Sequence, residues 1–143
     1  MAWSNIALTI TAELEDVVQT NIGDVKTEKV AAFPEDDEIQ AFIAGYGRAV
    51  LFRLVTDEPG TQGSDGYNER LYQYELLVVA DDRENRQDDI TSLTEQVKYY
   101  YQQNRTNGTV WQNIEIGPIE YQVVENQSNL KTAIMPLTVL RDG

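Results

Sequence analysis

The chain has 143 residues, no cysteine, no histidine and a formal net charge of −13, from 11 basic and 24 acidic side chains. This length fits a single domain, residues 1–143, whose core can form without disulfide bonds. The two missing residue types exclude disulfides, thiol and imidazole catalysis, and thiolate or imidazole metal sites. The acidic balance repels nucleic-acid phosphates and anionic lipids, so we expect neither sequence-specific nucleic-acid binding nor membrane binding.

The N-terminal segment predicts an amphipathic helix from Trp3 to Thr20, with Ser4 as its N-cap. Gly23 is expected to end this helix in the left-handed conformation. The residues before the helix contain no basic stretch and no long apolar run, so we expect no signal peptide. The apolar face of the helix comprises Trp3, Ile6, Ile10, Leu14, Val17 and Val18.

The next two segments predict weaker elements. Residues 24–33 alternate only weakly between apolar and polar side chains and predict an edge strand at most. The segment from Pro34 to Gly47 predicts a second, shorter helix, because proline is tolerated in a first turn. The acidic residues that follow Pro34 also favour the N-terminal end of a helix dipole.

Two apolar runs then predict paired strands. Ala49–Thr56 is mostly apolar and is typical of an interior strand, whereas Leu71–Val79 alternates before it becomes apolar on both sides. Between them, Asp57–Asn68 contains three glycines and one proline. It predicts a hairpin connection longer than the usual ~2–5 residues, and long surface connections are often functional.

A third helix is predicted from Asp88 to Asn104. It contains three consecutive tyrosines, Tyr99–Tyr101, whose side chains project at ~100° intervals around the helix. At least one of these rings is therefore expected to be exposed or to contact a partner. The apolar stripe of this helix comprises Ile90, Leu93, Val97 and Tyr100, and Tyr101 either belongs to it or contacts a partner.

The C-terminal part predicts two further strands, residues 111–124 and 130–140, with a bend at Gly117-Pro118 in the first of them. Pro136 lacks an N–H group, which suggests that the last strand lies at a sheet edge. The predicted elements follow the order α-(β)-α-β-β-α-β-β. This order indicates an α+β fold, with an antiparallel or mixed four- to five-stranded sheet and helices packed on one face.

The sequence contains no strong catalytic motif. Gly60, Gly63 and Gly66 are followed by no lysine and precede a strand rather than a helix, so they do not form a phosphate-binding loop. Acidic clusters such as 35–38 and 81–82 do not match a calcium-loop spacing, and we interpret them as helix caps and solvated turns. We therefore expect no enzyme activity, no metal and no cofactor. A small acidic metal-dependent enzyme is the one catalytic alternative.

Seven features follow one another in an order that is informative as a whole. They are the helix 3–20, the proline-started helix 34–47, the apolar strand 49–56, the polar loop 57–68, the Tyr-x-Tyr-x-Leu-x-Val strand 72–78, the helix 88–104 and a two-stranded tail ending Met135-Pro136-Leu137-Thr138-Val139. Taken together, they resemble the tail terminator (tail completion) proteins of long-tailed bacteriophages. The resemblance covers nearly the full chain as a pattern of elements rather than as an invariant motif.

The resemblance implies a structural virion protein without catalytic activity. Such a protein forms a ring, usually of six subunits, on the end of the tail tube, stops tube polymerisation and offers a surface for head attachment. The implied partners are further copies of the chain, the tail tube protein and the head connector or neck proteins, with DNA passing through the ring lumen. The implied location is the tail or neck of the virion, with assembly in the host cytoplasm.

The polar loop and the exposed aromatic residues are the candidate contacts with these partners. A glycine-rich loop that orders only on assembly would delay premature self-association. A head-completion or neck connector protein of a phage is the nearest alternative, since it shares the α+β pattern and ring assembly. The candidate interface residues are Trp3, Pro59, Gly60, Gly63, Gly66, Tyr67, Tyr99 and Tyr101.

Overall fold

Helices and strands follow one another as the sequence predicts for an α+β protein. The computed structural model describes residues 4–23, 25–36, 38–43, 47–62, 68–81, 89–106, 110–123 and 130–142. The elements are α1 (Asn5–Asn21), β1 (Lys26–Lys29), α2 (Ile39–Phe42), β2 (Arg48–Gln62), β3 (Asn68–Asp81), α3 (Asp89–Gln103), β4 (Asn113–Ile116), β5 (Glu120–Val123) and β6 (Leu130–Asp142). The predicted fold class and the order of its elements are confirmed.

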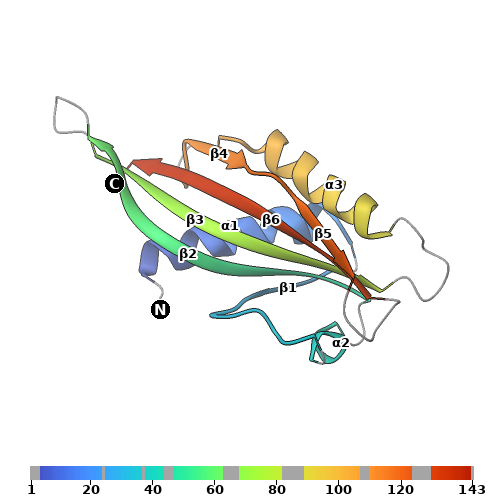
Figure 1. The fold of residues 1–143 in the computed structure, drawn as a ribbon. Helices are drawn as coiled ribbons and strands as arrows, with labels where there is room; N and C mark the ends of the chain where they lie inside the picture. The colour runs from blue at the N-terminus through green and yellow to red at the C-terminus, as the bar shows by residue number, and fades with distance from the viewer. Residues whose placement is uncertain are drawn as a thin grey trace.

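The strands form one mixed sheet in the order β1-β2-β3-β6-β4, and β5 also pairs with β6 (Figure 1). The β1–β2 pair is parallel, and the other pairs are antiparallel. The sheet has six strands rather than the expected four or five, because the bend at Gly117 divides the predicted strand 111–124 into β4 and β5. As predicted, β1 is a short strand at one edge.

The position of Pro136 corrects the expectation of an edge strand. β6 lies inside the sheet, between β3 on one side and β4 and β5 on the other. The Pro136 carbonyl accepts a hydrogen bond from the Gly117 N–H at 2.9 Å. Since the N–H and C=O of one strand residue point to the same side, the N–H that Pro136 lacks would face the break between β4 and β5. Pro136 can therefore lie in an interior strand, because neither β4 nor β5 needs a hydrogen bond from its backbone nitrogen at the break between them.

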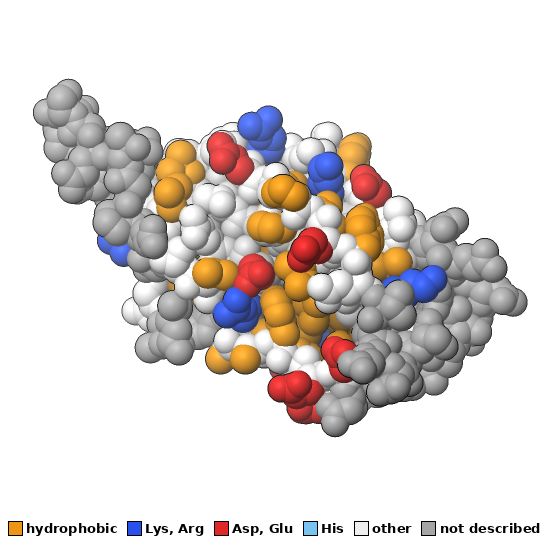
Figure 2. All heavy atoms as spheres, in the orientation of Figure 1, with side chains coloured by type: hydrophobic (Ala, Val, Ile, Leu, Met, Phe, Trp, Pro, Cys, Tyr) orange, Lys and Arg blue, Asp and Glu red, His pale blue; other side chains and the backbone are white. Residues whose placement is uncertain are grey.

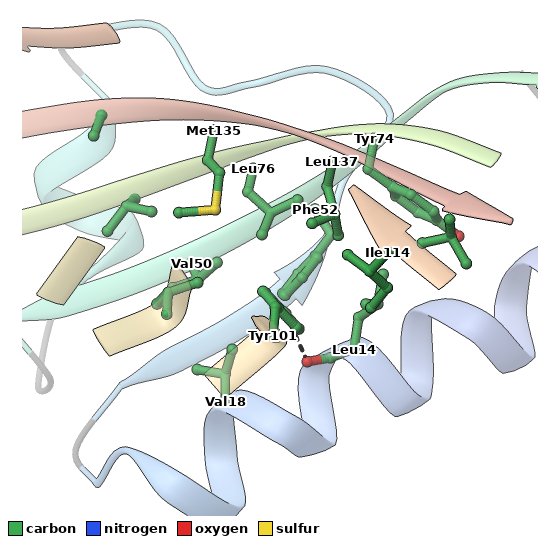
Figure 3. Close-up of a cluster of buried hydrophobic side chains, with 14 of the residues drawn as sticks. Leu14, Val18, Val50, Phe52, Tyr74, Leu76, Tyr101, Ile114, Met135 and Leu137 are labelled. Atoms are coloured by element: carbon green, nitrogen blue, oxygen red, sulfur yellow. Dashed lines mark hydrogen bonds between the residues drawn. The ribbon is translucent and has the colours of Figure 1, made fainter. Parts of the chain in front are cut away.

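One face of the sheet is covered by α1 and α3, and the main core lies beneath them (Figures 1 and 3). The alternation predicted for β3 is confirmed, since Tyr72, Tyr74, Leu76 and Val78 all belong to this core. Figure 3 shows side chains of β2, β3 and β6 meeting Leu14 and Val18 of α1. Burial of this apolar surface is the main driving force for folding.

Within the described residues, the opposite face is covered only near one end, by α2 and the segment before it, so the expectation that all helices pack on one face was wrong for α2. The core there comprises Ile39, Ile43, Ala49, Leu51, Leu77, Val79 and Leu130, with Val30, Phe33 and Ile134 packed against it. β2 therefore contributes buried side chains to both faces, as its mostly apolar sequence predicts.

Helix α1 agrees with its prediction at the start and differs at the end. Ser4 caps it, since the Ser4 hydroxyl oxygen accepts a hydrogen bond from the Ala7 N–H at 3.1 Å. Its C-cap is Ile22 in an extended conformation, and Gly47 is the only described glycine with a positive φ, so Gly23 does not end the helix in the left-handed form. The buried face comprises Ala7, Ile10, Thr11, Leu14 and Val18, whereas Ile6 is 39% exposed.

Two further predictions about element boundaries were wrong. The helix expected from Pro34 is the single turn α2, which begins after Glu38, so Pro34 precedes it without being its first residue. Strand β2 continues to Gln62, and β3 begins at Asn68, so more than half of the expected loop 57–68 is strand. Irregularities between Leu54 and Thr56, and between Pro59 and Gln62, let the hairpin accommodate its polar residues and proline.

Candidate interaction surfaces

Part of the second sheet face is not covered by any described helix or strand. Three cross-strand pairs of β3 and β6 lie on it, side by side: Glu75 with Pro136, Gln73 with Thr138, and Leu71 with Leu140. All six side chains are half-buried. We call these six residues, together with Arg53 of β2, the open sheet face. Figure 2 views the molecule from this side and shows apolar side chains over the middle of the sheet, among scattered charged ones.

One ion pair lies on the open sheet face. Arg53 pairs with Glu75 on the neighbouring strand, and about a third of each side chain is exposed, at 35% and 33%. The Arg53 guanidinium carbon also lies 5.6 Å from the centre of the Phe33 ring, within the range of a cation–π contact. The two contacts hold the guanidinium beside Glu75 and Phe33, while the exposed Glu115 of β4, opposite Thr138, adds a second carboxylate to this side of the sheet.

Tyr99 lies on the outer side of α3 and is 52% exposed, so one of the three consecutive tyrosines does face solvent, as predicted. Its ring meets Tyr100 edge to face, with the ring centres 5.1 Å apart. An exposed aromatic ring held in a fixed orientation is available to a partner at low cost in side-chain entropy. Tyr99 therefore remains a candidate interface residue.

Tyr101 was expected at an interface, and the structure places it in the core instead. It is fully buried, and its hydroxyl donates a hydrogen bond to the Leu14 carbonyl at 2.8 Å (Figure 3). The hydrogen bond joins α3 to α1, so the residue orders the two helices rather than offering a surface. Burial, with smaller contributions from Glu15 and Tyr74, raises the pKa of the Tyr101 phenol well above its ordinary value.

Two of the remaining candidates lie within the described residues. Pro59 and Gly60 belong to strand β2, and Pro59 is opposite Arg70 of β3. Four candidates lie outside the described residues: Trp3, Gly63, Gly66 and Tyr67.

An open depression of about 430 Å³ lies between the end of α3 and strand β4. It is lined by Lys98, Gln102, Arg105, Ile114, Glu115 and Ile116. Two cations and one carboxylate surround it, and its mixed, open lining differs from the enclosed apolar walls of most small-molecule sites.

Within the described part of the chain, no three aspartate or glutamate side chains come together in a way that could hold a metal ion. None of the described helices is long and apolar enough to span a bilayer.

The sequence analysis missed the open sheet face and the exposed Tyr121 of β5, which is 46% exposed. Partial burial and the neighbouring Glu95 carboxylate raise the pKa of Tyr121. A signal for the open sheet face was present, because residues 133–140 carry almost no polar side chain on either face of the strand. Such runs are typical of strands that are covered on both sides.

Comparisons with known proteins give little further information. No protein-family model matches the chain, and no curated protein matches it. Among solved structures, a chain from the "Virion of native gene transfer agent (GTA) particle" has a TM-score of 0.47 and 9% sequence identity, over 92% of this chain and 86% of that chain. A likeness at this level carries no argument about function.

Proposed function

We propose that this protein is a structural virion protein that forms a ring on the end of a phage tail tube. The ring stops tube polymerisation and provides the surface to which the head attaches. The observation that carries the proposal is the order of the elements: helix, short strand, helical turn, long hairpin, helix and C-terminal strands. It is the pattern on which the resemblance to tail terminator proteins is based, and it persists in the folded chain.

The exposed surface also supports an assembly role. A domain that acted alone would gain stability by covering the apolar part of its second sheet face. This chain instead leaves Leu71, Pro136 and Leu140 half-exposed, and it presents the ring of Tyr99 on α3. Half-exposed apolar and aromatic side chains of this kind are typical of residues that become buried between subunits.

The proposed contacts combine head-to-tail contacts between subunits with contacts to the tube. Neighbouring subunits in a ring make the same heterologous contact around the circle, which closes when the rotation closes. We place Tyr99 and the tip of the β2–β3 hairpin in these contacts. The proposed hairpin residues are Pro59, Gly60, Gly63, Gly66 and Tyr67, with Trp3 added from the N-terminus. The acidic balance of the chain would let DNA slide through the lumen without adhering.

The test is the tail length of phage particles that lack the protein. We expect lysates of a deletion phage to contain overlong tail tubes beside unattached heads, measured by negative-stain electron microscopy. The matched control supplies the intact gene from a plasmid and should restore tails of normal length. Normal tails beside leaking or tailless heads would instead identify a neck connector and contradict the terminator role.

A further inference from the structure

We propose that the free edge of strand β4 binds an extended, acidic segment of a partner protein, which adds to the sheet as a further strand beside α3. The segment lies in the depression between the end of α3 and β4 and places carboxylates next to Lys98 and Arg105. The site belongs to the folded chain alone, so its binding can be measured whatever part the protein has in a phage tail.

Strand β4 lies at one edge of the sheet, near α3 (Figure 1). Within the described residues, it pairs with β6 and with no strand on its outer side. The Gly117 N–H donates a hydrogen bond to the Pro136 carbonyl of β6, and Glu115 lies two residues earlier in the same register. Because the backbone groups of an antiparallel strand point alternately to its two sides, those of Glu115 face β6, whereas those of Ile114 and Ile116 point to the free edge. An extended peptide backbone matches such a row of unpaired groups.

Two cations line the depression beside this edge. Lys98 lies in the second half of α3 and Arg105 follows the helix, and neither forms an ion pair within the described residues. Glu115 also lines the depression. Its side chain points to the opposite face of the sheet, because Ile114 and Ile116 on either side of it pack in the main core. The lining on the α3 side is therefore cationic, in a chain whose formal net charge is −13.

An extended acidic peptide is the occupant that matches both features. Its backbone pairs with the free edge of β4, and carboxylates two residues apart project to one face of the added strand, where they meet Lys98 and Arg105. The net charge of the chain repels anions at long range, but a Debye length of about 8 Å at physiological ionic strength screens distant charges more than those in direct contact. A nucleic acid has no backbone N–H groups to pair with a strand, and a neutral or cationic segment gains nothing from the two cations.

The length of β4 sets the expected affinity. The strand has 4 residues, and at about 3.4 Å per residue it spans about 14 Å, the length of a short peptide segment. Ile114 and Ile116 each offer one N–H and one C=O group to that segment. Because these few hydrogen bonds form at a solvent-exposed edge, we expect a dissociation constant of about 100 μM.

The experiment measures the fluorescence anisotropy of a labelled octapeptide of alternating threonine and glutamate, titrated with the full-length chain at physiological ionic strength. All glutamates of this peptide project to one face when it is extended. Wild type should bind it with the affinity given above. The same peptide with lysine in place of glutamate should bind at least tenfold more weakly, because it brings cations to the two cations of the site.

Two variants of the protein test the role of the cations. Arg105→Glu should weaken binding about fivefold, and adding Lys98→Glu should bring the loss to at least tenfold. The matched control is Lys29→Glu, which makes the same change of charge at an exposed position of β1, at the other edge of the sheet. It should leave the dissociation constant unchanged. Circular dichroism melting shows whether the variants are folded.

Two modified peptides test the addition of a strand. One carries N-methyl groups on all its threonines and the other on all its glutamates, so that each lacks the N–H groups of one edge when it is extended. The peptide whose methyl groups face β4 should bind at least tenfold more weakly than the unmodified peptide, and the other should keep its affinity. Charge and length are the same in both, so the difference reports the backbone hydrogen bonds alone.

Several results would overturn the proposal. Equal binding of the glutamate and lysine peptides, or equal effects of Arg105→Glu and Lys29→Glu, would remove the role of the cations. Full binding of both methylated peptides would show an anion site without strand addition. Tighter binding of a thymidine octanucleotide than of the glutamate peptide would assign the depression to nucleic acid. Wild type that binds no peptide at millimolar concentration would show that the edge is closed. None of these results depends on whether the deletion phage makes overlong tails.

Discussion

The two faces of the sheet use the same strands for different purposes. Under α1 and α3, 24 buried apolar residues of the described chain form one core, whereas seven form the core under α2. Beyond α2, the residues of the open sheet face are half-buried and include the Arg53–Glu75 ion pair. Since folding free energy follows the apolar area that is removed from water, the helix-covered face supplies most of the stability. The open sheet face is thus free to be selected for contacts with other molecules.

Strand β3 contributes side chains to both faces of the sheet. Along β3, Tyr72, Tyr74 and Leu76 point into the main core, while the alternate residues Leu71, Gln73 and Glu75 lie on the open sheet face. Because successive strand residues point to opposite faces, a substitution on one face leaves the other largely unchanged. The two faces can therefore be tested separately with variants of a single strand.

The largest expected effect is the difference in unfolding free energy between two leucine variants of β3. Leu76 is fully buried beneath the helices, and Leu76→Ala should lower the free energy of unfolding by about 2–5 kcal/mol, as buried leucine truncations do. Leu71→Ala on the open sheet face should cost about 1 kcal/mol or less, because part of that side chain is already in water. Urea denaturation of both variants, with the slope of the transition checked for equality, measures the difference.

Equal losses of stability in the two leucine variants would contradict the difference between the two sheet faces. Such a result would mean that the open sheet face is as well covered in the free protein as the helix-covered face.

A smaller effect is expected at Tyr101, which joins the two helices of the covered face. Tyr101→Phe keeps the ring and removes the hydrogen bond to the Leu14 carbonyl, so it should cost about 1 kcal/mol at pH 7. Because burial raises the folded-state pKa of Tyr101, the unfolded chain loses this proton first, at about pH 10. Above that pH the folded state binds more protons than the unfolded state, so wild type loses stability as the pH rises.

Tyr101→Phe removes this ionisation and therefore isolates it from the other tyrosines. The stability difference between wild type and variant should be constant from pH 7 to about pH 9 and should shrink above about pH 10. Urea denaturation at several pH values measures it. A difference that stays constant through that range would show that Tyr101 ionises as easily in the folded state as in the unfolded one. The residue would then be a surface residue after all.

The sequence predicted the fold class well because periodicity reports burial directly. The alternating residues of β3 are buried in the main core, as are Ile90, Leu93 and Val97 of the α3 stripe, while Tyr100 packs against that core and is partly buried. Boundaries were less predictable where two rules compete. Pro34 can begin a helix, but in this chain it precedes a single turn that starts after Glu38. Gly23 can accept a left-handed conformation, but Ile22 ends α1 in an extended one.

The candidate site was harder to predict, because it depends on what the fold leaves uncovered. Local sequence marks Pro136 as unsuitable for a central strand. Only the arrangement of β4, β5 and β6 shows that its missing N–H faces a break between strands. Similarly, Tyr101 and Tyr99 are the same residue type on one helix. Their different environments follow from the position of α1, which covers one and leaves the other exposed.

The smallest expected effect is at Gly117, which lies in the break between β4 and β5 and contacts Pro136 of β6. A Cβ atom at Gly117 would lie 3.1 Å from the Pro136 Cβ, and the proline ring has no alternative rotamer that moves this atom away. Gly117→Ala also reduces the entropy of the unfolded chain, which is worth about 0.4–1 kcal/mol in favour of folding. The two effects oppose each other, and we expect a net loss of about 0.5 kcal/mol.

Gly23→Ala is the matched control, because no atom lies within 4 Å of the added Cβ and Gly23 does not have a positive φ. It should raise the free energy of unfolding by about 0.4 kcal/mol or more, since only the entropy effect remains. Urea denaturation of the two alanine variants should therefore give changes of opposite sign. If Gly117→Ala is as stable as Gly23→Ala, Pro136 and its neighbours can shift enough to make room for the added methyl group. The close packing of Gly117 against Pro136 at the strand break would then not limit which side chain fits there.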